Sequence, residues 1–305
     1  LFPSLGLPAE AFSVEGVEYG GGVGFLKAGI WYADRIATVS PTYAAEITTP
    51  EGGMGLDGLL RGRAGAVSGI LNGLDTTVWD PATDPLLPVR FSAADMAPRA
   101  QLKAALQARF GLAEDAAAPL FAFIGRLAWQ KGVDLLLAAL PAVLEAGGQL
   151  VLLGAGEAGL EQACRDAAAA HPGRVGAEIA FREDLAHLLY GGADCVVVPS
   201  RFEPCGLTQL CALRYGAPPL VARAGGLADT VVDANEAALA AGVATGLMVA
   251  PGSAAALTAG VARAAALWRD GAAWRRMQAN GMAADLSWTR SAARYAGLFH
   301  EVLAA

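Results

Sequence analysis

The chain has 305 residues and a formal net charge of −7, which argues against a nucleic-acid-binding surface. Hydrophobic residues make up 54% of the chain, but no apolar run approaches the ~18 residues of a membrane span. We therefore predict a soluble protein with a sizeable core, built as two domains or as one domain and a part. Because neither end has a basic stretch followed by an apolar run and a small-residue cleavage site, the cytoplasm is the expected compartment.

The first 80 residues contain too few strands for a complete parallel sheet. In chain order, the pattern predicts an irregular opening (1–22), a helix (25–32), a strand (35–39), a short helix (42–47), a flexible glycine-rich segment (52–65) and a strand (66–71). Asn72-Gly73 then ends the second strand as a tight turn. Since a sheet usually has ~5–6 strands, we expect the chain to begin inside a domain. The absence of an initiator methionine agrees, although trimming or cloning would explain it equally well.

Residues 80–119 form a proline-containing boundary that includes an amphipathic helix near 99–110. Beyond this boundary, strands alternate strictly with helices. The predicted strands are 120–124, 149–153, 175–181, 194–198 and 219–222, with 246–249 as a candidate last strand. The predicted helices are 133–146, 158–170, 185–190, 207–215, 227–233, 254–269, 272–280 and 287–303. This alternation indicates a Rossmann-type α/β domain with a parallel sheet. We therefore predict domains at 1–80 and 81–285, and a closing helical segment at 286–305.

One stretch combines a strand, a turn and the start of a helix. Val196–Val198 reads as a buried parallel strand, and the chain then turns through two prolines into a helix that begins near Gly206. Ligands bind at the carboxyl edge of such a sheet, and the free N–H groups from Gly206 to Thr208 suit a phosphate. Glu203, just before them, can contact whatever is attached to that phosphate. The alternative is a capped helix with a solvated acid at its entrance.

Two further loops fall on the same edge. Arg126 and Lys131 follow the first strand of the predicted second domain, and a planar guanidinium with a compact ammonium suits the neutralisation of a departing diphosphate. Two solvated loop charges are the alternative. Gly225 and Gly226 follow a later strand and would let the backbone approach a ligand closely.

Cysteines and histidines show no pattern of a metal or nucleophile site. The cysteines lack C-x-x-C spacing and are predicted to be buried or partly buried free thiols: Cys164, Cys195, Cys205 and Cys211. His171, His187 and His300 have no ligand or nucleophile partner in the sequence, so we predict structural roles for all three.

A second function class rests on a glycine motif. Gly154, Gly156 and Gly159 form G-x-G-x-x-G after a predicted strand, and Glu178 follows about 20 residues on, as in an NAD-binding oxidoreductase. Against this, the fingerprint belongs after the first strand of its unit, and here a strand and a helix precede it. A catalytically silent carbohydrate-binding or regulatory fragment is a third possibility, because the first domain is short.

Several motifs, taken together, resemble those of bacterial glycogen synthase, the ADP-glucose-dependent relative of plant starch synthase. In the predicted second domain they are Gly125-Arg126-Leu127, Gln130-Lys131-Gly132, the stretch 199–209 (PSRFEPCGLTQ) and the stretch 225–231 (GGLADTV). In the predicted first domain, the motifs are Tyr32-Ala33-Asp34, the stretch 39–43 (VSPTY) and the stretch 71–75 (LNGLD). The resemblance covers nearly the whole chain.

The resemblance implies the GT-B architecture, in which two Rossmann-type domains enclose the active site. It implies a retaining hexosyltransferase that moves glucose from ADP-glucose to the non-reducing end of an α-1,4-glucan, without a metal or other cofactor. Its implied site residues are Arg126 and Lys131 on the diphosphate, Glu203 on the donor glucose, Cys205, Gly206, Leu207 and Thr208 along glucose and phosphate, and Asn72 on the sugar from the other domain. The final helix would cross back onto the first domain.

The chain also departs from the family pattern. The Lys-Thr-Gly-Gly-Leu loop and the active-site histidine of the first domain are absent, and about half of that domain is missing. Related enzymes carry a second acid where this chain has Cys211, to which we assign no catalytic role, and Ala224 replaces a frequent threonine. We expect the chain by itself to be inactive in glucan elongation, because half of the catalytic cleft is missing. The sequence gives no indication of an oligomeric state.

Overall fold

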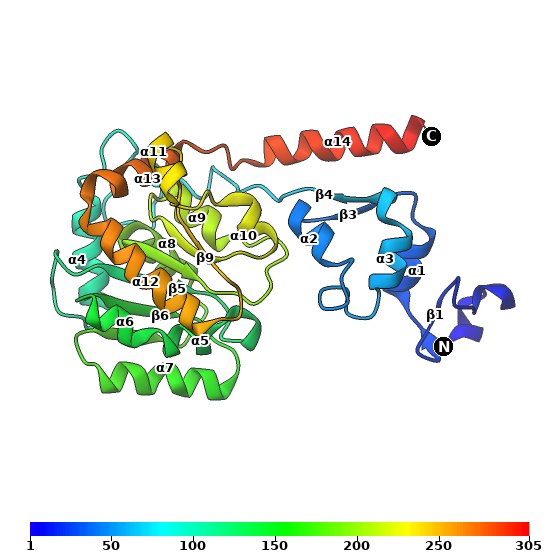
Figure 1. Cartoon of the computed structure of the whole chain (residues 1–305), viewed down its shortest axis with the longest axis horizontal. Coiled ribbons are helices and arrows are strands. Elements are labelled where there is room, and N and C mark those ends of the chain that lie inside the picture. Colours follow the sequence, from blue (N-terminus) through cyan, green and yellow to red (C-terminus); the bar gives the residue numbers. More distant parts are fainter. Residues whose placement is uncertain (305) are drawn as a thin grey trace. The chain divides into compact units, whose positions relative to one another are not determined.

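The computed structural model describes residues 1–304, which divide into two compact units (Figure 1). The first unit comprises Leu1–Asn72 together with the chain from Thr289 onward, and the second comprises Gly73–Trp288. The units meet along the chain at 72/73 and 288/289, whereas the predicted domains meet at 80/81 and 285/286. Each unit is described by itself.

The second unit is built around a six-stranded parallel sheet, as predicted. In spatial order the strands are β10 (Leu247–Val249), β9 (Pro219–Ala222), β8 (Cys195–Val198), β5 (Leu120–Ile124), β6 (Gln149–Leu153) and β7 (Val175–Glu178). From β5 the chain adds strands on one side through β6 and β7, and it then returns to β8 on the other side of β5. The strand order therefore reverses between β5 and β8, where α/β sheets bind ligands.

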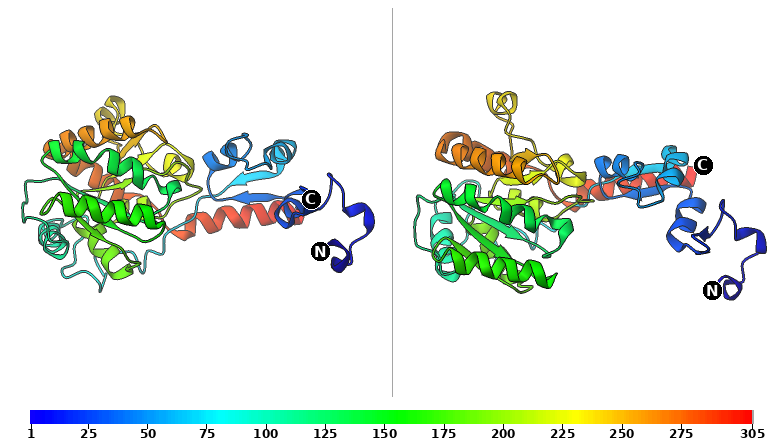
Figure 2. Two further views of the ribbon diagram at one scale, coloured as in Figure 1. Left: turned by 90° about the horizontal axis from the view of Figure 1, so that it is seen from below. Right: turned by 60° about the horizontal axis from the view of Figure 1, so that its bottom comes forward.

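Helices cover both faces of this sheet (Figure 2). The helices of this unit are α4 (Arg99–Arg109), α5 (Val133–Ala138), α6 (Leu140–Glu145), α7 (Ala158–Ala170), α8 (Glu183–Gly192), α9 (Thr208–Arg214), α10 (Gly225–Thr230), α11 (Glu236–Ala241), α12 (Ala254–Arg269) and α13 (Gly271–Ala283). Because successive side chains of a strand point to opposite faces, Phe121 and Phe123 of β5 join the core under α5, α6 and α12, while Leu120 and Ala122 join the core under α4, α8 and α9.

Some predicted elements of the second unit were wrong in detail. The helix predicted at 133–146 is two helices, because Pro141 lies in the first turn of α6 and cannot continue the hydrogen-bonding of α5. Helix α11 was not predicted; Asn235 caps it by accepting a hydrogen bond from the Ala238 N–H at 2.9 Å. The strand predicted at 175–181 ends at Glu178.

The first unit contains one parallel strand pair, β3 (Ile36–Thr38) with β4 (Val67–Gly69). Its helices are α1 (Phe25–Tyr32), α2 (Pro41–Glu46), α3 (Asp57–Gly62) and most of α14 (Trp288–Ala304), and its 3-10 turns are η1 (Phe2–Leu5), η2 (Ala9–Ala11) and η3 (Ala64–Ala66). Arg294 of α14 donates to the Gly69 carbonyl at 3.0 Å. The segments 1–22 and 52–65 were predicted without regular elements, but regular elements begin in both. The chain forms the hairpin of β1 (Glu18–Tyr19) and β2 (Gly22–Val23) at the end of the first segment, and α3 in the second.

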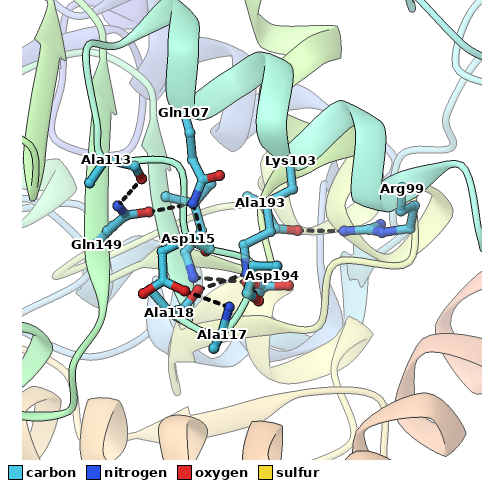
Figure 3. A network of polar contacts seen from close by, with 12 residues as sticks. Arg99, Lys103, Gln107, Ala113, Asp115, Ala117, Ala118, Gln149, Ala193 and Asp194 are labelled. Carbon is cyan, nitrogen blue, oxygen red and sulfur yellow. Dashed lines mark hydrogen bonds and ion pairs between the residues drawn. The ribbon is translucent and has the colours of Figure 1, made fainter.

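A buried polar network fastens α4 beneath the amino edge of the second unit's sheet (Figure 3). Arg99 donates to the Ala193 and Tyr215 carbonyls, and burial lowers the pKa of its guanidinium to about 10. One turn later, Lys103 Nζ donates to the Ala118 carbonyl and to Asp194 Oδ2, each at 2.7 Å. Because buried charge is costly unless it is paired, these contacts fix the position of α4.

We predict that replacing Lys103 with Met lowers the free energy of unfolding by about 1.5–3 kcal/mol, the range for hydrogen bonds to charged groups. Lys103 is only 7% exposed, and its loss leaves Asp194 and the Ala118 carbonyl without this donor. Urea denaturation measures the change. The matched control is Arg165→Ala, which breaks an exposed ion pair with Glu161 and should change stability by less than about 1 kcal/mol. Equal effects of the two substitutions would contradict the interpretation.

Candidate functional site

The loops that follow β5 and β8 meet where the strand order reverses. The loop after β5 contains the 3-10 turn η4 (Trp129–Lys131), which ends at Gly132. Gly132 is left-handed (φ 68°), and a Cβ on it would lie 2.1 Å from the Pro199 carbonyl oxygen. The Arg201 N–H donates to the Gln130 carbonyl at 2.8 Å, and Gln130 Nε2 donates back to the Phe202 carbonyl at 3.1 Å. The η4 turn is therefore packed directly on the segment 199–203.

This packing brings Lys131 and Glu203 together. Lys131 Nζ lies 2.5 Å from Glu203 Oε2, and the buried Ser200 hydroxyl donates to the same oxygen at 2.9 Å. Glu203 is 6% exposed, so it is not the solvated helix-entrance acid that was the alternative in sequence. Arg126 lies on the same loop, is exposed, and donates to Gln130 Oε1 at 3.0 Å. Of the two cations, Lys131 is thus engaged with Glu203 and Arg126 faces solvent.

The glycines after β9 allow a close approach of two backbone segments. A Cβ on Gly225 (φ 42°) would lie 2.0 Å from the Glu203 carbonyl oxygen, and one on Gly226 would lie 2.1 Å from that of Cys205. The Gly226 N–H donates to the Glu203 carbonyl at 3.0 Å. In the structure these glycines hold the protein's own segment 203–205 in place. That their backbone also approaches a ligand stays a prediction.

Gln209 orders the turn between Glu203 and α9, a role that the sequence analysis did not assign. Its fully buried side chain donates to the Cys205 carbonyl at 3.1 Å and to the Gly206 carbonyl at 2.9 Å, with a third contact to Thr230. Gly206 is left-handed (φ 73°). The chain therefore passes through Leu207 into α9, which begins at Thr208.

A cavity of about 400 Å³ opens beside these loops, within the second unit. Its wall includes the predicted residues Arg126 and Thr208. Most of its other residues were not predicted from the sequence. They include Trp79, Ile124, Leu153, Phe181, Arg182, Glu183 and Tyr190. Phe181 and Arg182 follow β7, so the rule that ligands bind at the carboxyl ends of strands would have found them. Trp79 and Tyr190 carried no such signal.

Trp79, which belongs to the second unit, is held in place by buried polar side chains. Its ring stacks on His187 with centroids 4.0 Å apart. His187 Nδ1 lies 2.7 Å from Asp84 Oδ2, which also accepts the Tyr215 hydroxyl at 2.6 Å. Burial, followed by the bond to Asp84, raises the pKa of Tyr215. The structural role predicted for His187 is confirmed.

The glycine motif after β6 is also explained by packing. A Cβ on Gly154 would lie 1.9 Å from the Gly125 carbonyl oxygen, and one on Gly156 would lie 2.2 Å from that of Leu127. Gly159 has open space. The first two glycines thus join the loops after β5 and β6.

The remaining predicted residues are placed as follows. The four cysteines are buried and outside any disulfide, as predicted, and burial raises the pKa of Cys211 to about 12, which disfavours a reactive thiolate. Asn72 is the last residue of the first unit's leading segment, and its contact with a sugar stays a prediction. Across residues 1–304, no three or more His, Cys, Asp or Glu side chains gather as a metal site. Among the described helices, none has the length and apolar character to cross a membrane.

Comparison with known families identifies the chain's class. Residues 106–281 match the family model of group 1 glycosyl transferases, and residues 1–62 match the starch synthase catalytic domain. The chain belongs to the group 1 glycosyltransferase family. The expected resemblance to bacterial glycogen synthase is confirmed as well: the chain is 58% identical to glycogen synthases of Acidiphilium cryptum and of Rhodopseudomonas palustris strain HaA2, over 99% of its length in each case. It spans 63% of the length of those relatives.

Solved structures agree with this family. The chain is similar to the catalytic domain of starch synthase IV from Arabidopsis thaliana bound to ADP and acarbose, with a TM-score of 0.92 and 34% identity over 98% of this chain and 63% of that one. A sucrose-phosphate synthase from Thermosynechococcus elongatus shares the fold, with a TM-score of 0.62 and 24% identity over 92% of this chain and 61% of that one. The predicted α/β, GT-B fold class is confirmed, and the NAD-dependent oxidoreductase finds no support.

We predict that Gly226→Ala lowers the free energy of unfolding by about 1–3 kcal/mol, as overpacking does, because the new methyl group meets the Cys205 carbonyl. The control is Gly159→Ala, at an unobstructed position in α7, which should leave stability unchanged or raise it by up to ~1 kcal/mol. Thermal and urea denaturation of both variants provide the test. A Gly226→Ala variant as stable as the parent would mean that the contact of this glycine with Cys205 is not close.

Proposed function

We propose that this chain carries the donor-binding part of a retaining glucosyltransferase that moves glucose from ADP-glucose to the non-reducing end of an α-1,4-glucan. The observation that carries the proposal is the ion pair between Lys131 and the buried Glu203, beside a cavity at the reversal of strand order. The relatives named glycogen synthase and the starch synthase bound to ADP and acarbose support it. Because the chain spans 63% of the relatives' length, the activity is proposed for a protein of the relatives' length.

The cavity suits a nucleoside. At about 400 Å³ it falls within the ~300–1,000 Å³ of small-molecule sites. Trp79 and Tyr190 supply aromatic surface, and Ile124 and Leu153 supply apolar surface. Arg126 lies on the cavity wall and Lys131 on the same loop, so a diphosphate that leaves the cavity toward Glu203 would pass both cations. Positive charge fixed in advance stabilises the leaving group as its bond to glucose breaks.

Glu203 is assigned to positioning the sugar rather than to nucleophilic attack. Its Oε2 accepts from Lys131 and Ser200. Glu203 directly precedes the turn that we place along the phosphate, so it approaches the sugar from nearly the same side as the leaving group, whereas a nucleophile must attack from the opposite side. Its main chain is fixed by Gly226. In the mechanism that we favour, the acceptor hydroxyl enters on the face that the diphosphate leaves and gives its proton to the departing phosphate. Glu203 holds a glucose hydroxyl and stabilises the developing positive charge on the ring.

Other residues complete the proposed site. The segment Cys205, Gly206, Leu207 and Thr208 lies along glucose and phosphate, and Asn72 approaches the sugar from the other domain. Arg126 and Lys131 provide the positive charge that a metal ion supplies in other phosphate-transferring sites, so we propose that no metal or other cofactor takes part. We place the reaction in the cytoplasm.

We predict that Lys131→Ala lowers kcat by on the order of 10²–10³, because a preorganised charge on the leaving group is lost. The measurement uses a chimera in which the unmatched part of the Acidiphilium cryptum relative is joined to this chain, with labelled ADP-glucose and glycogen as substrates. Arg165→Ala, on the surface of α7, is the control and should keep the parental kcat. A Lys131→Ala chimera with normal kcat and a lower melting temperature would assign Lys131 a structural role only.

A second prediction separates the two possible roles of Glu203. In the same chimera, Glu203→Gln keeps the shape and removes the charge, so it should reduce kcat while ADP affinity stays within a few-fold. Azide added to Glu203→Ala should not restore turnover. Recovery of glucosyl azide of the inverted, β configuration would show that a nucleophile had been removed, and the positioning role would then be wrong.

A further inference from the structure

Arg201 makes an unusual number of contacts with the turn that carries Lys131. Its Nη1 donates to the Trp129 carbonyl at 2.6 Å. Its Nη1 and Nη2 donate to the two carboxylate oxygens of Asp134 at 2.8 and 2.6 Å. The guanidinium also lies over the Trp129 ring, 4.5 Å from its centroid. One side chain from the segment after β8 therefore holds both the start of the η4 turn and the first turn of α5.

These contacts lie on either side of Lys131 in the sequence. Trp129 precedes Lys131 by two residues and Asp134 follows it by three. The Arg201 N–H adds a bond to the Gln130 carbonyl. The side chain of Lys131 reaches Glu203, and Arg201 holds the residues on both sides of Lys131.

The contacts of Arg201 with Trp129 and Asp134 require arginine. A planar guanidinium binds both oxygens of a carboxylate and stacks on an aromatic ring at once, which the point charge of lysine cannot do. Their mutual hydrogen bonds lower the pKa of Asp134 and raise that of Arg201. Because the pKa of Asp134 is lowered on folding, the pair's stabilisation is present above the ordinary pKa of an aspartate and is lost as the pH falls through the folded value.

We propose that Arg201 is a positioning residue for the reaction: it fixes the η4 turn so that Lys131 Nζ is held between Glu203 and the diphosphate of the donor. This inference rests on the proposed function, because it takes Lys131 as a contact of the diphosphate. Arg201 itself touches the turn, and it acts on the ligand only through Lys131.

The test uses isothermal titration of the 305-residue chain with ADP and with adenosine, which lacks the phosphates. Arg201→Ala and Arg201→Lys should each weaken ADP binding about tenfold, the loss expected for a weakened charge-assisted hydrogen bond. Adenosine affinity should stay within twofold. In a Lys131→Ala background, Arg201→Ala should weaken ADP binding by less than a further twofold, because the group that it positions is gone. Arg165→Ala serves as the matched loss of a surface arginine and should change neither affinity.

Three results would overturn the proposal while leaving the donor site intact. If Arg201→Ala weakens ADP tenfold even without Lys131, Arg201 acts independently of it. If adenosine affinity falls as much as ADP affinity, the substitution disturbs the cavity as a whole. If Arg201→Lys keeps the parental ADP affinity, a positive charge alone suffices and the contacts of the guanidinium with Trp129 and Asp134 are not needed. By contrast, a parent chain that binds no ADP would contradict the proposed function, and this inference with it.

Discussion

The ion pair between Lys131 and Glu203 is the interaction on which the candidate site depends. A buried carboxylate such as Glu203 needs a partner, and Lys131, whose side chain is 22% exposed, supplies the opposite charge. The partners come from loops after two different strands, so the pair exists only when β5 and β8 are neighbours. The ion pair therefore depends directly on the strand order of the sheet.

Close backbone contacts make this constraint rigid. Gly132 packs on the Pro199 carbonyl, and Gly225 and Gly226 pack on the carbonyls of Glu203 and Cys205. The segment 199–205 is consequently held between the loop after β5 and the loop after β9. A site built this way keeps its charges in place before a ligand arrives, which is the condition under which electrostatic stabilisation of a leaving group is most effective. Adaptation to the ligand is left to Arg126, which faces solvent.

Sequence patterns predicted the architecture well where local signals and packing agree. The strands at 120–124, 149–153 and 219–222 and the helix at 254–269 have the predicted bounds, because their apolar periodicity matches their burial. The prediction failed where one residue overrides a periodic pattern, as Pro141 does between α5 and α6. It also failed in alanine-rich α11, where the hydrophobic pattern carries little information.

For the site, the sequence could place groups on one edge of the sheet but could not pair them. Arg126, Lys131 and Glu203 follow strands and so were assigned to the carboxyl edge, yet the direct contact of Lys131 with Glu203 spans 72 residues and depends on strand order. Trp79 is held at the cavity by ring contacts with His187, Tyr190 and Tyr215, which are tertiary contacts with no local signal. A crystal structure of the chain with ADP tests the central claim most directly. The account predicts adenosine in the cavity that Trp79 and Tyr190 line, with Lys131 Nζ in hydrogen-bonding distance of the diphosphate. ADP bound instead with its diphosphate at the start of α7, beside Gly154 and Gly156, would contradict it.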